Sequence, residues 1–161
     1  MKFLSFILFF ILSITAKAQD MQTPKEECEN LMNEILPFAE KMLREHGEFL
    51  PFGGKMITSG EVVHVGASDG REQPPSIDLI KLLRQGFANE AKESKLKATA
   101  IVYDVRITPP GMNKKMDAIQ IDLNHRDGYS VSVIFPYILK DGQIEYGDVF
   151  ASRLELSPFK N

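Results

Sequence analysis

The stretch that decides the fold is KATAIVYDVRITPPGMNKKMDAIQIDLNHRDGYSVSVIFPYIL, residues 97–139. Apolar and polar residues alternate in three segments of it, which is typical of β-strands with one buried face. A loop rich in proline and glycine, residues 108–115, separates the first two segments, and the tight turn Arg126-Asp127-Gly128 separates the last two. The stretch therefore predicts three consecutive antiparallel strands, with the preceding chain folded against one face of their sheet.

The alternation and the turn together predict the register of these strands. Three apolar sets alternate with polar residues: Ile101, Tyr103, Val105 and Ile107; Ile119, Ile121 and Leu123; and Val131, Val133 and Phe135. Pairing Tyr103 with Ile121 and Ile121 with Val133 places all three sets on one side of the sheet. The same pairing leaves a three-residue turn in which Gly128 takes the positive-φ position. The opposite, polar side is then expected to face solvent or to be covered by something polar.

Two helices are expected before and between the strands. The segment Thr23-Pro24-Lys25-Glu26 has the composition of a capping box, and apolar residues recur every three or four positions up to residue 46. Residues 48–65 predict a hairpin, residues 76–94 a second amphipathic helix, and residues 143–150 a final strand. The predicted fold class is α+β: an antiparallel sheet of five to six strands with two helices packed on one face, in the order α-β-β-α-β-β-β.

The first 18 residues predict a cleaved signal peptide. Lys2 supplies a positive charge, residues 3–14 are almost wholly apolar, and Ala16-Lys17-Ala18 matches the small-x-small pattern that signal peptidase recognises. The apolar run is shorter than the roughly 20 residues of a membrane-spanning helix. We therefore expect a bacterial protein that is exported, periplasmic or secreted, with residues 19–161 forming a single α+β domain.

Composition narrows the classes of partner. The net charge of −3 is mild, and no basic stripe with interleaved aromatic residues occurs, which argues against nucleic acid. A second long apolar segment is missing, so no stable membrane insertion is expected after signal cleavage. Cys28 is the only cysteine, which excludes an intrachain disulfide. Its acidic neighbours oppose a reactive thiolate, and we expect a half-buried helix residue.

Five segments carry aromatic, glycine and charged residues in a characteristic order: LPFAE (36–40), HGEF (46–49), PFG (51–53), VYDVR (102–106) and HRDGY (125–129). In these segments the chain resembles a group of small bacterial proteins to which no activity is assigned. The order of helices and strands also resembles that of profilin-like and roadblock-like domains. These resemblances imply the limits of the domain and its general architecture, and they imply no catalytic residues.

The polar residues predict no metal site, cofactor site or catalytic motif. The three histidines, His46, His64 and His125, have no HxxxH or HxH spacing, and a single cysteine excludes a CxxC pair. Nucleophile elbow, phosphate-loop and dinucleotide fingerprints do not occur. We therefore expect no cofactor and no metal, and we assign no catalytic residue.

Two groups of polar residues are candidates for binding. The predicted register places Asp104 and Arg106 near Asp122, and carboxylates about 5–9 Å apart are the arrangement of glycoside hydrolases. On an open sheet face, however, such charges usually pair and face solvent. The second group lies in loops 66–75 and 108–115, which are expected at one end of the sheet, where binding residues often lie. The candidate binding residues are Asp69, Arg71, Asp104, Arg106, Asp122, Lys114 and Lys115.

Three functions fit these observations. The favoured one is a non-catalytic binding or interaction module whose ligand is an unidentified protein or small molecule. An alternative is a small hydrolase that uses Asp104, Asp122 and either His125 or His64. A third is an immunity or inhibitor-type protein that masks a toxin or an enzyme. The sequence favours a protein without catalytic activity but leaves that question open.

Overall fold

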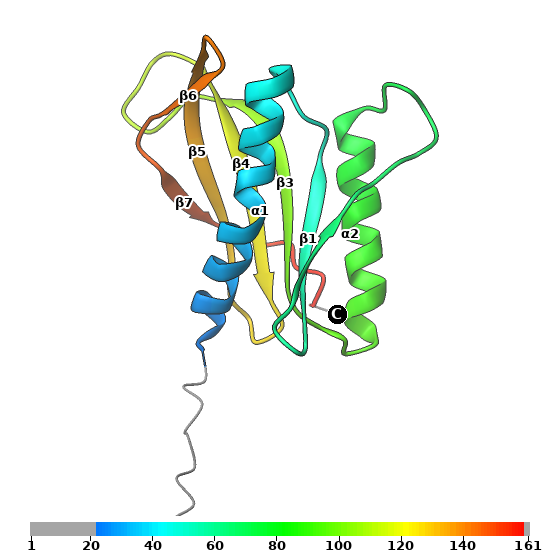
Figure 1. Cartoon of the computed structure of the whole chain (residues 1–161). Coiled ribbons are helices and arrows are strands. Elements are labelled where there is room, and N and C mark those ends of the chain that lie inside the picture. Colours follow the sequence, from blue (N-terminus) through cyan, green and yellow to red (C-terminus); the bar gives the residue numbers. More distant parts are fainter. Residues whose placement is uncertain (1–21, 160–161) are drawn as a thin grey trace, which may run out of the picture.

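The computed structural model describes residues 22–159, in which a β-sheet lies between two helices (Figure 1). The predicted signal peptide, residues 1–18, lies outside the described residues. The elements in chain order are α1 (Pro24–His46), β1 (Phe52–Ile57), β2 (Val62–Val65), α2 (Ser76–Lys92), β3 (Leu96–Ile107), β4 (Met116–His125), β5 (Ser130–Lys140), β6 (Gln143–Tyr146) and β7 (Phe150–Arg153). The sheet is antiparallel, which confirms the predicted α+β class and the order of elements through β5, and it has seven strands instead of five or six.

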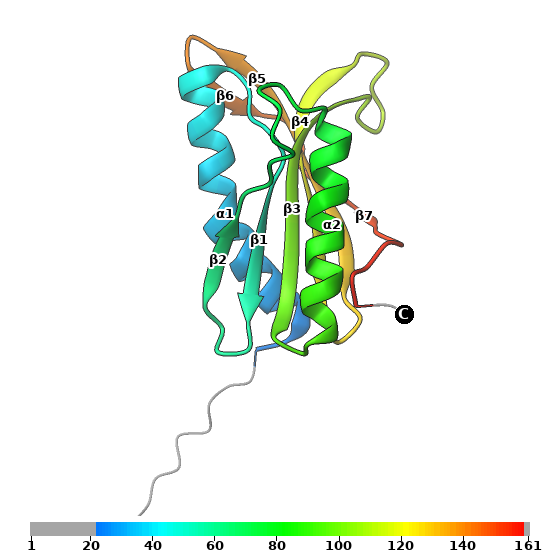
Figure 2. The same ribbon diagram turned by 90° about the vertical axis from the view of Figure 1, so that its right-hand side faces the viewer.

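Both helices pack on the sheet as predicted, with one correction: they cover opposite faces. The strand order is β2-β1-β3-β4-β5-β6, and β7 pairs with β5. Helix α1 packs through Ile35 on the face that carries Ala100 and Val102. Helix α2 packs through Phe87 on the face that carries Ile101. Because neighbours along a strand point to opposite faces, these contacts place the helices on either side of β3, as Figures 1 and 2 show.

The register between β4 and β5 is as predicted, whereas the register between β3 and β4 differs by one residue. Ile121 pairs with Val133 of β5, but its partner in β3 is Val102 and not Tyr103. A displacement of one residue moves Tyr103 to the α2 face. The cause is the burial of residues 98–102 without interruption, because a strand covered on both sides has no alternation that specifies its register.

The outer edge of β5 pairs with two short strands instead of the single predicted strand 143–150. The C-terminal half of β5 pairs with β6, and its N-terminal half pairs with β7. Pro136 lies between the two halves, and its carbonyl oxygen accepts a hydrogen bond from Gly147 at 2.8 Å. Proline has no N–H to donate to an edge partner, so the pairing breaks where Pro136 stands.

The first helix begins with a side-chain cap, and the second helix begins without one. α1 begins with the predicted capping box between Thr23 and Glu26 and ends at Gly47, whose φ of 78° is left-handed. The helix continues through Pro37. α2 begins at Ser76, which is its first helical residue, and its N-cap is Pro75, which offers no side-chain cap. Among residues 22–159, no helix is both long enough and apolar enough to cross a membrane.

Two successive glycines of β1 allow both helices to approach the sheet. A Cβ atom on Gly53 would lie 2.7 Å from Cζ of Phe87 in α2, and one on Gly54 would lie 2.7 Å from Cγ2 of Ile35 in α1. Both distances are too short for carbon atoms in contact. The glycines are therefore required by packing on two different faces.

Replacing either glycine with alanine is expected to destabilise the protein by about 1–3 kcal/mol, because each methyl group overpacks a filled interface. Phe87→Leu should reduce the destabilisation caused by Gly53→Ala but not that caused by Gly54→Ala. Ile35→Leu should reduce the destabilisation caused by Gly54→Ala but not that caused by Gly53→Ala. Double-mutant cycles in urea unfolding measure these couplings. Relief of Gly53→Ala by Ile35→Leu would contradict the placement of the helices on opposite faces.

Candidate functional site

The predicted cluster of Asp104, Arg106 and Asp122 does not exist, because Asp104 and Asp122 lie on opposite faces of the sheet. Asp104 lies on the α1 side, where its Oδ1 accepts a hydrogen bond from the hydroxyl of Tyr137 at 3.1 Å. Burial of this carboxylate raises its pKa above the usual range. Asp122 pairs in register with Ile101, on the α2 side. The displaced register of β3 is the reason for the error, and the paired-carboxylate hydrolase loses its geometric support.

The two candidate loops lie at the same end of the sheet, as predicted, but at separate corners of it (Figure 1). In the first loop, Nε of Arg71 donates to Asp69 at 2.8 Å, and its NH2 group donates to Asp78 of α2 at 2.7 Å. These two predicted binding residues therefore fasten the loop to the first turn of α2. In the second loop, Lys114 and Lys115 are exposed.

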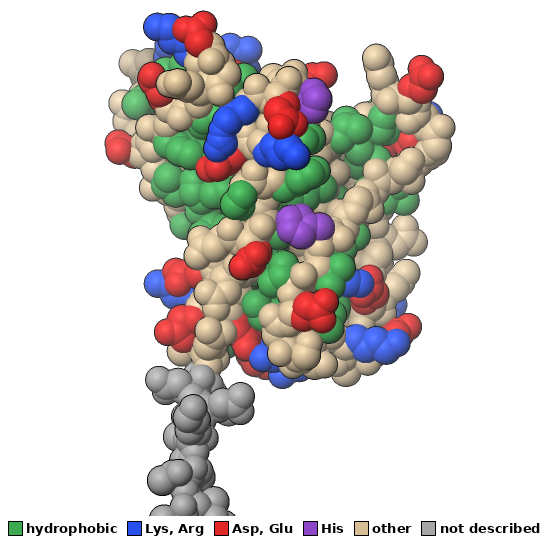
Figure 3. Space-filling view, viewed as in Figure 1, with side chains coloured by type: hydrophobic (Ala, Val, Ile, Leu, Met, Phe, Trp, Pro, Cys, Tyr) green, Lys and Arg blue, Asp and Glu red, His purple; other side chains and the backbone are tan. Residues whose placement is uncertain are grey.

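Cys28 is buried, whereas His46 and His64 lie on the surface. Burial, reinforced by Glu27 and Glu29, raises the pKa of Cys28 to about 12, so the thiol stays protonated. Histidine side chains are visible on the face shown in Figure 3. His46 and His64 are both exposed.

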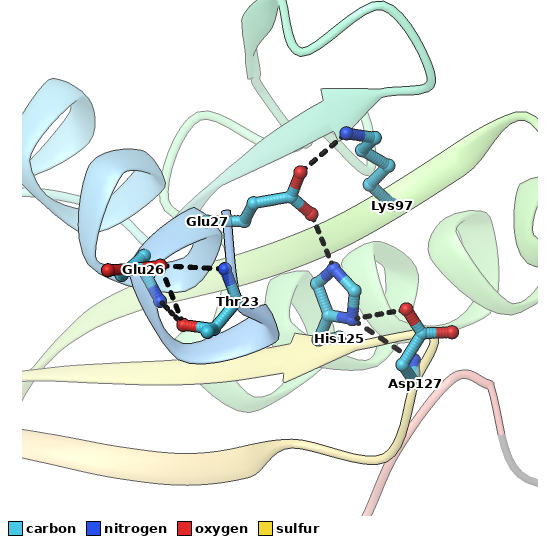
Figure 4. Close-up of polar contacts among 6 residues, drawn as sticks. All are labelled: Thr23, Glu26, Glu27, Lys97, His125 and Asp127. Carbon is cyan, nitrogen blue, oxygen red and sulfur yellow. Dashed lines mark hydrogen bonds and ion pairs between the residues drawn. The ribbon is translucent and has the colours of Figure 1, made fainter. Parts of the chain in front are cut away.

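The third histidine, His125, is buried and belongs to a network of charged side chains. Nε2 of His125 lies 2.7 Å from Oε2 of Glu27, and Nζ of Lys97 lies 2.5 Å from the other Glu27 oxygen (Figure 4). The backbone N–H of Asp127 donates to Nδ1 of His125 at 3.0 Å. Nδ1 is therefore an acceptor, and Nε2 carries the proton that Glu27 accepts. The ring is 2% exposed, and both of its nitrogens are occupied.

The network joins the start of α1 to the ends of β3 and β4. Glu27 follows the capping box of α1, so the cap that begins the helix also places this carboxylate over the sheet (Figure 4). Burial by itself raises the pKa of Glu27, but the hydrogen bonds from Lys97 and His125 outweigh it, and the pKa lies below the ordinary 4.5. Glu27 is thus a carboxylate that holds three elements together.

The best candidate site lies on the opposite face, around Asp122. This carboxylate is 3% exposed. Its Oδ1 accepts from Ser132 at 2.5 Å and from Gln120 at 2.9 Å. Its Oδ2 accepts from Tyr103 at 2.9 Å and from Arg84 of α2 at 3.2 Å. A carboxylate has about four lone-pair positions, so Asp122 has no acceptor position left.

Tyr103 stays protonated in this cluster. Its burial raises its pKa well above the ordinary 10.0, and the charge of Asp122 raises it further. The phenol therefore donates to Asp122, and it accepts a hydrogen bond from Gln120 at 2.6 Å. The phenolic proton of Tyr103 is therefore committed to the hydrogen bond with Asp122.

A pocket of about 210 Å³ opens above this cluster, between α2, the strands β3 and β4, and the C-terminal segment 154–158. The residues that line the pocket are mainly apolar: Phe87, Ala88, Ile101, Leu154, Leu156 and Pro158. The polar residues that line it are Arg84, Thr99, Asp122, Asn124 and Ser157. Figure 2 shows the C-terminal segment running beside α2 on this face. Apolar walls with a few converging polar groups are the usual composition of a small-molecule site.

Sequence reasoning named Asp122 but missed its partners. Gln120, Asp122 and Asn124 alternate along β4, and this polar stripe predicts a face that is solvated or covered by something polar, without indicating which. The available signal that a polar group lies beneath α2 was Arg84, an arginine placed between the buried Leu83 and Phe87.

Within the part of the chain that the structure describes, no group of three or more His, Cys, Asp or Glu residues is placed to hold a metal ion. No family model, curated protein or solved structure matches the chain. The resemblance to profilin-like and roadblock-like domains therefore stays a prediction.

Proposed function

We propose that the protein is an exported, non-catalytic binding module that holds a small amphipathic molecule in the pocket above Asp122. One observation carries the proposal: a buried carboxylate with four bound donors stands at the base of a pocket with apolar walls. A catalytic site that used this carboxylate as a general base would leave one of its acceptor positions open for the proton of the substrate. Here it is fully used in holding Arg84 and Tyr103 in place, which is a positioning role.

The polar groups left over in the pocket define the chemistry of the ligand. Arg84 uses one terminal nitrogen on Asp122, and its other N–H groups remain. Asn124 accepts from Ser130 through its oxygen at 2.8 Å, which leaves its amide nitrogen as a donor. The guanidinium of Arg84 and the amide nitrogen of Asn124 are therefore both donors, and they match a ligand whose head is an acceptor, such as a carboxylate or a carbonyl. Leu154, Leu156 and Ile101 suit its apolar body.

The size of the pocket limits the ligand to a small molecule. A volume of 210 Å³ corresponds to roughly seven water molecules at about 30 Å³ each. A six-carbon carboxylate such as hexanoate is a suitable probe. With modest efficiency for each non-hydrogen atom, its Kd is expected on the order of 1 mM or below.

We expect hexanoate to bind more tightly than 1-hexanol, and 1-hexanol more tightly than hexylamine, when the three are titrated by NMR at neutral pH. Arg84→Met removes the cationic donor and should lower the affinity for hexanoate by about tenfold or more, while leaving the affinity for 1-hexanol nearly unchanged. Lys81→Met is the matched control, because Lys81 is an exposed cation one turn earlier on α2.

A steric variant separates binding in this pocket from binding elsewhere. Ala88 lines the wall and is half-buried, so Ala88→Phe should fill the space without altering the hydrogen bonds of Asp122. Loss of hexanoate binding in Ala88→Phe supports the proposal. Unchanged binding in this variant, or tighter binding of hexylamine than of hexanoate, would overturn it.

A further inference from the structure

A second surface lies on the opposite side of the sheet, where a groove of about 910 Å³ runs between the C-terminal half of α1 and loop 66–75. α1 contributes Phe38, Met42 and His46 to it; the chain that follows contributes Glu48, Phe49 and Leu50; and Glu72, Gln73, Pro74, Ser76 and Asp104 complete it. The groove is separate from the Asp122 pocket, because Asp104 and Asp122 belong to opposite faces.

The apolar part of the groove is both exposed and firmly supported. Phe38 is 41% exposed and Leu50 is 53% exposed. Phe38 packs edge-on against Phe52, with ring centroids 4.9 Å apart, and Phe49 packs on the same ring at 5.9 Å. Phe52 is 6% exposed and belongs to the core. The exposed aromatic surface is thus held by the core beneath it, and hydrophobic side chains gather on this face in Figure 3.

The charges that line the groove have one sign. Glu48, Glu72 and Asp104 are its charged side chains, and neither lysine nor arginine is among the lining residues. His46 is the other titratable group. The nearby cation Arg44 is already paired with Glu40 at 2.8 Å. An apolar groove with an acidic rim matches an occupant that is apolar in the middle and positively charged on either side.

We propose that this groove binds a short segment of a partner protein in which lysine or arginine flanks a large apolar side chain. The apolar side chain would lie against Phe38 and Leu50, as anchors do at the centre of an interface. The basic side chains would lie near Glu48 and Glu72, and a guanidinium or ammonium over the face of Phe38 adds a cation–π contact. The proposal does not depend on the Asp122 pocket.

The test uses three synthetic peptides of equal length that alternate leucine or phenylalanine with lysine, glutamine or glutamate. Fluorescence anisotropy with the whole mature protein should give binding in the order lysine, glutamine, glutamate. The affinity for the lysine peptide should fall by about tenfold as the salt concentration rises from 50 to 500 mM, because the charges at the rim of the groove are solvent-accessible. Equal affinity for the lysine and glutamate peptides would overturn the proposal.

Matched variants locate the binding. The double variant Glu48→Gln/Glu72→Gln should bind the lysine peptide about tenfold or more weakly than the wild type. Leu50→Ser should lower the affinity by a similar factor without changing the net charge. The control pair, Glu34→Gln with Glu61→Gln, removes the same two charges from exposed positions outside the groove. An equal loss of affinity for the lysine peptide in the control double variant would show that general charge attraction accounts for binding, and it would overturn the proposal. So would a concentration-dependent dimer that Leu50→Ser abolishes, since a second copy would then be the occupant.

The outcomes of the two proposals are distinguishable. Ala88→Phe, which fills the pocket beneath α2, should leave peptide binding unchanged, and Leu50→Ser should leave hexanoate binding unchanged.

Discussion

Asp122→Ala is expected to lower the free energy of unfolding by about 3–5 kcal/mol, the cost of removing one partner from a buried, charged hydrogen-bond network. The substitution leaves four donors without their acceptor. Arg84 is 39% exposed in its side chain and can turn to water. Tyr103 and Ser132 lie deeper, and each unsatisfied buried donor costs about 1–3 kcal/mol. Equilibrium unfolding in urea, followed by circular dichroism, measures the change.

Two further variants make this prediction specific to the network. Asp117, on the same strand, is 55% exposed in its side chain and 3.8 Å from Arg106, so Asp117→Ala should change stability by no more than about 0.5 kcal/mol. Tyr103→Phe removes one of the four donors and should cost about 1 kcal/mol. A change below 1 kcal/mol for Asp122→Ala would show that the carboxylate does not hold the pocket together.

Glu27→Ala is expected to have an effect of similar size, about 3–5 kcal/mol, because it leaves the buried His125 and the partly buried Lys97 without their shared acceptor. Two strands and the first turn of α1 meet at this carboxylate, and the contact between Glu27 and His125 spans 98 residues of chain. Glu29→Ala is the matched control on the same helix. Its side chain is 46% exposed and 3.6 Å from Lys25, so the change should stay within about 0.5 kcal/mol.

The same carboxylate predicts how stability depends on pH. The pKa of Glu27 in the folded protein lies below its ordinary value of 4.5, so near this pH the unfolded chain binds more protons, and the stability contributed by Glu27 rises with pH. That contribution is complete above the ordinary value and is lost as pH falls through the lower, folded pKa. The difference in stability between wild type and Glu27→Gln should therefore shrink below about pH 4. A difference that stays constant from pH 7 to pH 3 would contradict this role of Glu27.

The strand pairing that the sequence predicts correctly is the one in which alternation of polar and apolar residues is supported by a tight turn. In β5 and in β4 the alternation is visible, and the turn at Gly128 selects the same register, so the pairing of Ile121 with Val133 is predicted. In β3 the apolar residues Ala100, Ile101 and Val102 follow one another without a break, and Thr99 and Ile101 are buried beside Ala98, Ala100 and Val102, so the alternation from Tyr103 onward does not fix the register. The displaced register and the assignment of both helices to one face follow from that single ambiguity.

The candidate site shows a similar limit. Asp122 could be named from the polar stripe on β4, but Arg84, which covers it, is 38 residues distant in the chain. A polar stripe next to a covering helix and a polar stripe next to water have the same local sequence. The distinction depends on the helix on the far side of the sheet, which a pattern within one strand does not specify.

The central claim is that the pocket above Asp122 binds an acceptor-headed amphipathic molecule, and intermolecular NOEs with hexanoate test it most directly. On isotope-labelled protein comprising residues 19–161, the account predicts NOEs from the hexanoate chain to methyl groups of Ile101, Leu154 and Leu156, together with a shift of the Asn124 side-chain amide. All of these should vanish in Ala88→Phe. NOEs confined to residues outside this pocket, or no NOE and no shift at hexanoate concentrations of about 20 mM, well above the expected Kd, would contradict the claim.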